Sequence, residues 1–147
     1  MIITANDFIN SGLPTSTDIT TSEIDFAIKN IELYMVKSYL TDTIYNSIIE
    51  TPQNYTQYID GTTTIGGLKL AEYHLVFSYL LYDKIRLTRY SSVIKNDENS
   101  TDPAFSEVFE LAQYHWNFGL HFLKEVCMDL NVLTDETYND LIFSELI

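Results

Sequence analysis

The stretch GLKLAEYHLVFSYLLYDKIRLTRY, residues 67–90, decides how the rest of the chain is interpreted. It contains no proline and is long enough for about six turns of α-helix. Residues 73–82 within it are apolar or aromatic on nearly every side, and a helix of that kind is usually buried all round. We therefore predict an all-α fold, a small helical bundle around a central buried helix over about residues 67–90.

Amphipathic segments on either side of this stretch predict the helices that pack against it. The first begins near Thr21 or Ser22, has Glu32 among its polar positions, and spaces its apolar residues by three and four: Ile24, Ile28, Ile31, Met35 and Tyr39. A break at residues 40–42 separates it from a short helix that Pro52 ends. A second long helix begins at Pro103, a residue favoured at the first helical position, and reaches about Asn131.

The whole chain of 147 residues fits one domain in three parts. Residues 1–21 predict an extended N-terminal arm with one short helical turn capped by Thr4 or Asn6. Residues 22–131 form the helical bundle, and residues 132–147 form a C-terminal tail. Inside the bundle we predict a weak hairpin between residues 55–59 and 62–65, joined by the turn signal Asp60-Gly61.

The charge of the chain excludes some partners. The net charge is −13, which argues against binding to free nucleic acid and to anionic membrane surfaces. The longest nearly apolar run, residues 75–82, is much shorter than the ~20 residues that span a bilayer. The N-terminus has no signal-peptide pattern, so we expect a protein that is cytoplasmic or assembled from cytoplasmic parts.

The distribution of charge suggests contacts between copies of the chain. Residues 65–95 carry a net charge of +3, whereas residues 1–64 carry −6 and residues 96–147 carry −10. The basic residues near the end of the central helix either complement its C-terminal dipole or meet an acidic surface on a neighbouring subunit. The polar loop over residues 91–103 is either a solvated tip or a contact loop. The candidate subunit-contact residues are Lys84, Arg86, Arg89, Lys95, Asp97 and Glu98.

No catalytic or ligand-binding signature appears in the sequence. His74, His115 and His121 lack the spacing of a helical zinc pair, and no Glu-x-x-His motif of di-iron bundles is present. We interpret these histidines as core or interface residues and the lone Cys127 as a small buried side chain. We therefore expect no catalytic residue, metal or cofactor, and a binding or structural role in place of an enzymatic one.

The order of these parts resembles a known family. The segments IELYMVKSYLTDTIYNSIIE (31–50), GGLKLAEYHLVFSYLLYDKIRL (66–87) and SSVIKNDENSTDP (91–103) follow an N-terminal arm and precede another long helix. This layout, over roughly residues 20–130, resembles the small head-to-tail connector proteins of tailed bacteriophages, also called adaptor, head-completion or neck ring proteins. The resemblance lies in the order of the segments and in their general residue character, and it includes no diagnostic motif.

The resemblance implies a virion protein that is assembled in the host cytoplasm. Such proteins form a homo-oligomeric ring of about a dozen copies beneath the portal protein, in contact with other neck or tail proteins. The arm, the loop and the tail would hold neighbouring subunits or line the channel. DNA would pass through the ring without specific binding, and an acidic lumen suits that passage because it repels the phosphates.

Two other function classes stay open at the level of the sequence. A small acidic binding module, such as a DNA-mimic inhibitor or regulator, would place its carboxylates in phosphate-like rows on one surface of a monomer. Here the acids are spread over both ends of the chain. An unrecognised helical enzyme would need a pocket with convergent polar groups.

Overall fold

The computed structural model describes residues 1–14, 19–62, 66–95 and 103–132, with the backbone alone for 84–95 and 103–106. These residues form helices and no strand, which confirms the all-α prediction. The elements, in chain order, are α1 (Ala5–Ile9), α2 (Thr21–Ile31), the π-helix η1 (Glu32–Val36), α3 (Lys37–Glu50), the 3₁₀-helix η2 (Pro52–Asn54), α4 (Thr56–Ile59), α5 (Gly67–Lys95) and α6 (Pro103–Asp129).

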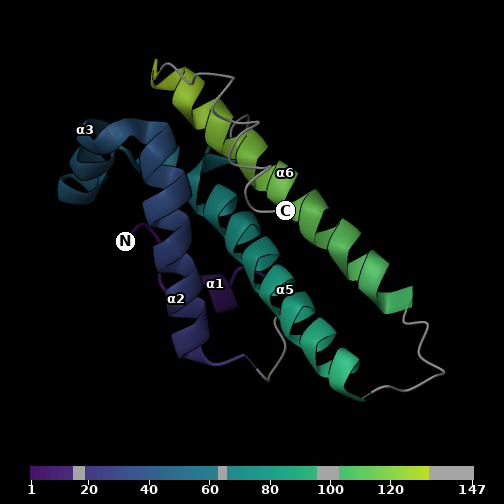
Figure 1. Cartoon of the computed structure of the whole chain (residues 1–147). Coiled ribbons are helices and arrows are strands. Elements are labelled where there is room, and N and C mark those ends of the chain that lie inside the picture. Colours follow the sequence, from purple (N-terminus) through teal and green to yellow (C-terminus); the bar gives the residue numbers. More distant parts are fainter. Residues whose placement is uncertain (15–18, 63–65, 96–102, 133–147) are drawn as a thin grey trace.

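Helix α5 is the centre of the fold. It lies between α2 and α6 and packs against both, most extensively against α6 (Figure 1). None of residues 66–83 is exposed, although half of them are only partly buried, so this part of the helix is central to the fold without being fully enclosed. In Figure 1, α2 and α6 both run from the lower to the upper part of the picture, and α5 runs the opposite way. The three long helices therefore stand side by side with α5 in the middle.

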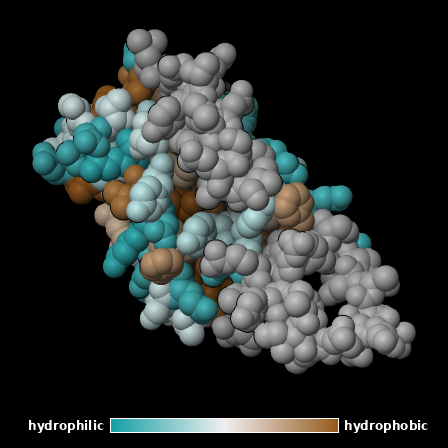
Figure 2. Space-filling model, viewed as in Figure 1, coloured by the Kyte–Doolittle hydropathy of each residue, from teal (hydrophilic) through white to brown (hydrophobic). Residues whose placement is uncertain are grey.

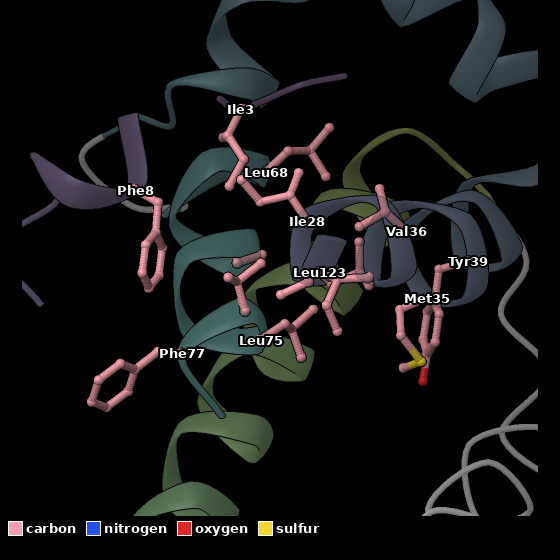
Figure 3. Packing of buried hydrophobic residues seen from close by; sticks show 14 of the residues in the cluster. Ile3, Phe8, Ile28, Met35, Val36, Tyr39, Leu68, Leu75, Phe77 and Leu123 are labelled. Carbon is pink, nitrogen blue, oxygen red and sulfur yellow. The ribbon is translucent and has the colours of Figure 1, made fainter. Parts of the chain in front are cut away.

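The core fills the space between these three helices. Ile28 of α2, Leu68 and Leu75 of α5, and Leu123 of α6 are all fully buried and lie close together (Figure 3). The apolar positions that the sequence predicts on the first helix, from Ile24 to Tyr39, are all buried too. Burial of a large aliphatic side chain contributes about 1.5–3 kcal/mol, so this shared interior is the main source of stability.

A glycine sets how closely α5 and α6 approach. A Cβ atom added at Gly119 would lie 2.7 Å from Cγ of Leu75 and 2.9 Å from the carbonyl oxygen of Ala71. Both distances are shorter than van der Waals contact, so α6 reaches its present position because residue 119 has no side chain. Near this approach the Ser78 hydroxyl donates a 2.6 Å hydrogen bond to the Ala112 carbonyl, which links the two helices.

The helix that follows the N-terminal segment contains two irregularities. The break predicted near residues 40–42 is present, because Thr41 has a left-handed φ of 67° inside α3. The placement of Glu32 among polar positions is wrong, because Glu32 is buried. It lies at the start of η1, and its carboxylate accepts hydrogen bonds from the Ile2 backbone N–H and the Tyr45 hydroxyl, two groups that are distant in sequence.

Two further sequence predictions are wrong in the described residues. Residues 56–59 form the short helix α4, so the predicted hairpin does not form on that side, and residues 63–65 lie outside the described part. The N-terminal segment does contain one short helix capped by Thr4. However, its described part is not an extended arm, because Ile3 and Phe8 are fully buried in the core of the same chain.

The hairpin of the two long helices is longer than predicted. Helix α5 continues to Lys95, five residues beyond the predicted end at Tyr90. Helix α6 begins at Pro103, as the sequence predicts. The loop predicted over residues 91–103 is therefore shorter, and residues 96–102 lie outside the described part. The predicted C-terminal tail, beyond residue 132, also lies outside it.

Candidate interaction surfaces

Large apolar side chains on α2 and η1 face outward. Phe26, Leu33 and Tyr34 expose between 54% and 65% of their surface. Phe26 and Leu33 are seven residues apart, which is two helical turns, so they lie on the same side of the helix that α2 and η1 form. Lys29 lies between them along the chain and Lys37 follows one turn later. We call this group of five residues the α2 surface.

A second outward-facing apolar group lies on α6. Leu111, Tyr114 and Phe118 expose between 37% and 58% of their surface and recur at three- and four-residue spacing. Glu107 and Glu110, both exposed, precede them on the same helix. We call this group of five residues the α6 surface. Figure 2 shows brown apolar side chains among teal polar ones on the described part of the molecule.

The two surfaces differ in charge. Of the four lysines whose side chains are described, Lys29 and Lys37 belong to the α2 surface. Lys37 lies 3.5 Å from the exposed Asp42, whereas Lys29 forms no ion pair with a described side chain. The same is true of Glu107 and Glu110 on the α6 surface, so charges of opposite sign, without an ion-pair partner among the described side chains, accompany the two apolar groups. Asp25, half-buried beside Lys29, reduces the positive potential of the α2 surface.

The inner side of the α6 surface contacts a histidine pair. Nδ1 of His74 on α5 lies 2.7 Å from Nδ1 of His115 on α6, and the rings are stacked with centroids 5.0 Å apart. The pair shares one proton between the two nitrogens, since one must donate and the other accept. Burial, and then the charge of His115, lowers the pKa of His74 to about 4. Burial also lowers the pKa of His115. Both rings are therefore neutral near pH 7.

Aromatic rings enclose this histidine pair. Phe77 meets His115 edge-on at 4.6 Å, and Phe118 meets His74 edge-on at 5.0 Å between centroids. Tyr114 stacks on Phe118 at 5.7 Å. The pair has no carboxylate neighbour in these contacts, so it packs as part of an aromatic cluster, which agrees with the interpretation of His74 and His115 as core or interface residues.

A pair of buried carboxyl groups lies at the opposite side of α5. Both oxygens of Glu72 are buried and make no hydrogen bond to a described residue. Glu32 accepts hydrogen bonds from the Ile2 backbone N–H and from the Tyr45 hydroxyl, the latter at 2.7 Å. Burial, followed by the charge of Glu32 and its side-chain interaction with Glu72, raises the pKa of Glu72 well above its ordinary value. The surroundings of Glu72 therefore favour its neutral form in the folded protein.

A shallow pocket of about 390 Å³ lies where the N-terminal segment crosses α3 and α4. Its walls are mostly apolar, among them Ile2, Ile48 and Ile59. The charged groups at its edge, Lys69 and Asp60, satisfy each other at 2.8 Å. Gln53 and Thr56 also line it, so the pocket wall combines apolar side chains with a few polar ones.

The remaining candidate reactive side chains, Cys127 and His121, already have partners within the chain. Cys127 is fully buried, as the sequence predicts, and burial raises the pKa of its thiol to about 12. Its neutral thiol donates to the Tyr39 carbonyl at 3.6 Å. His121, the third histidine, is exposed and lies 3.2 Å from Glu125. Within residues 1–14, 19–62, 66–95 and 103–132, no group of three potential metal ligands comes together.

The structure places four of the six predicted contact residues on one helix. Lys84, Arg86, Arg89 and Lys95 all lie on α5, and Lys95 belongs to the helix and not to the loop. Lys84 and Arg86 lie further from the C-terminal end of the helix than the sequence predicts, because the helix continues to Lys95. Asp97 and Glu98 lie outside the described residues.

The histidine pair and the α6 surface were missed by sequence reasoning, although a signal for the pair exists. In a helical hairpin, facing residues have numbers that add to nearly the same value. His74 with His115, Ser78 with Ala112, and Tyr82 with Phe109 all follow this rule. Assuming that the two long helices form a hairpin, the sequence alone suggests that His74 and His115 face each other.

Comparisons of this sequence with known proteins find no relative. No protein-family model, no curated protein and no solved structure matches this sequence. Among the described residues, no helix has both the length and the apolar character needed to cross a bilayer. The candidate site with the strongest physical basis is therefore the pair of outward-facing apolar surfaces.

Proposed function

We propose that the chain is a structural protein of a tailed-bacteriophage neck, where copies of it form a ring between the portal and the tail. The resemblance in layout to head-to-tail connector proteins supports this proposal, as does the helical hairpin at the centre of the fold. In this role the protein works by contacting sister copies and neighbouring virion proteins, and it transforms no substrate.

The observation that carries the proposal is the presence of two separate exposed apolar surfaces on the two outer long helices, α2 and α6. Scattered exposed apolar residues are normal, but groups of large ones at helical spacing mark contact sites. Two such groups on different sides of one chain allow each copy to contact two neighbours. A closed ring needs this arrangement, because its repeated contact joins unlike surfaces.

The charge of the chain supports the same role. A ring that passes DNA must not hold it, and each cation offered to phosphate strengthens binding. A protein with a net charge of −13 repels the phosphates on average. Copies of this chain would therefore give a channel wall along which DNA slides.

Electron microscopy tests the proposal directly. The purified protein is imaged alone and after mixing with portal particles, and rings that attach to one end of the portal are expected. Portal particles without the added protein serve as the control for portal self-assembly. A protein that stays a single copy at high concentration and leaves portal particles bare would overturn the proposal.

A further inference from the structure

We propose that the α2 surface of one copy docks on the α6 surface of a second copy, and that this contact repeats around the ring. The inference deepens the proposed function and rests on it. It names the partner of both surfaces as another copy of this chain, and it names the two helix faces that meet.

The placement of the surfaces favours contact between unlike faces. Helices α2 and α6 lie on either side of α5, so the α2 and α6 surfaces belong to the two outer helices of the bundle (Figure 1). Contact between two α6 surfaces would bring Glu107 and Glu110 against the same acids of the second copy. Like charges in direct contact are unfavourable. Contact between an α2 surface and an α6 surface instead brings Lys29 toward these acids.

The two surfaces also match in length. Phe26 and Leu33 span seven residues, as do Leu111 and Phe118, and seven residues of helix extend about 10 Å. Helices α2 and α6 run in the same general direction within a copy but are inclined to each other (Figure 1). Each surface therefore offers the other an apolar stripe of about two turns.

Contact between the two surfaces brings opposite charges together. Lys29 lies between Phe26 and Leu33 on the α2 surface, and Glu110 directly precedes Leu111 on the α6 surface. A lysine side chain is long enough to bridge one turn. A second copy therefore covers the apolar stripe of each surface and offers Lys29 a carboxylate partner, which makes it the occupant that these surfaces fit.

Blocking one surface at a time tests the pairing. Leu33→Asp removes the α2 surface of a copy and leaves its α6 surface intact, and Leu111→Asp does the reverse. Both positions are substantially exposed, so folding is expected to persist, and circular dichroism checks it. Thr43→Asp, at an exposed position of α3 outside both surfaces, is the matched control. Size-exclusion chromatography with light scattering measures the mass of each variant.

The expected results follow from unlike pairing. Each blocked variant alone is a single copy of 17.0 kDa, and Thr43→Asp assembles like the unmodified chain. An equimolar mixture of the two blocked variants forms a pair and nothing larger, because only one intact α2 surface and one intact α6 surface meet. Dimers of either blocked variant alone would overturn the inference, since they require contact between like surfaces.

The neck role and the surface pairing fail in distinguishable ways. If the mixed variants form pairs while the unmodified rings ignore portal particles, the pairing stands and the neck role falls. If the unmodified protein binds portal but both blocked variants still form its rings, the neck role stands and the pairing is wrong. If the chain and all variants remain single copies that leave portal bare, both are wrong.

Discussion

Glu72 is the residue whose environment departs most from its expected one. Carboxyl groups on a surface helix are usually solvated, but this one is buried against Glu32 without a hydrogen-bond partner among the described residues. The pKa of Glu72 is raised in the folded protein from an ordinary value of 4.5. Between these two values the folded state keeps a proton that the unfolded chain loses, so the contribution of Glu72 to stability is greatest below about pH 4.5. It decreases as the pH rises through the raised pKa.

Replacing Glu72 by Gln is expected to remove this decrease of stability with rising pH. Glutamine has nearly the same shape and carries no charge at any pH. The free energy of unfolding should match that of the unmodified chain near pH 4 and exceed it by about 1–3 kcal/mol at pH 8. Urea unfolding at both pH values measures the difference. Glu50→Gln, at an exposed carboxylate, should show no such gap, and an equal effect at pH 4 and pH 8 would contradict the explanation.

His74 contributes a pH dependence of the opposite sign. The pKa of His74 lies near 4 in the folded protein against an ordinary 6.5. Between these values the unfolded chain binds a proton that the folded chain does not, so stability decreases as the pH falls from about 6.5 toward 4. One such group changes stability by at most about 1.4 kcal/mol per pH unit. Solvent screening at the partly exposed His74 makes the pKa shift, and so the total effect, smaller.

His74→Gln should therefore flatten the loss of stability between pH 6.5 and pH 4. Unfolding curves at pH 7, 6 and 5 measure it, each compared with the unmodified chain at the same pH. The contribution of Glu72 is common to both proteins, whereas His115, whose pKa is lowered too, keeps part of the acid dependence in the variant. His121→Gln removes an exposed histidine and should leave the acid dependence in place. A variant of His74 that loses stability as steeply as the parent would refute the assignment.

At the level of elements, the contact between α5 and α6 depends on Gly119. Alanine at this position would favour helix by about 1 kcal/mol, but its Cβ would overlap Leu75 and the Ala71 carbonyl. Overpacking of this kind costs about 1–3 kcal/mol. The midpoint of thermal unfolding for Gly119→Ala should fall, with a net loss of up to about 2 kcal/mol. Asn117→Ala, two residues away and exposed, should instead leave stability unchanged or raise it slightly.

The elements were largely predictable, because their signals are local. The apolar run in α5, the three- and four-residue spacing in α2, and Pro103 at the start of α6 each act within a few residues. Glu32 was misplaced because its burial depends on Ile2 and Tyr45, which are distant in sequence. The hairpin prediction failed because residues 56–59 form a helical turn that η2 leads into.

At the level of the whole molecule, the candidate site was the least predictable part. An exposed apolar residue and a buried one look alike in a sequence until the inward face of each helix is known. Phe26 and Leu33 lie outside the buried stripe of α2, and Tyr114 lies outside that of α6. The side chains gather into surfaces only because α5 takes the central position. The basic residues that the sequence singled out on α5 remain a separate prediction of subunit contact.

Trp116 is the one tryptophan of the chain, and it is buried on α6 with an indole N–H that makes no hydrogen bond to a described residue. An indole held away from water emits at short wavelength, and the emission shifts to the red when solvent reaches the ring. The natural fluorescence of the protein therefore reports from a single place, the interior side of α6. Loosening of α6 during assembly would be visible without any attached dye.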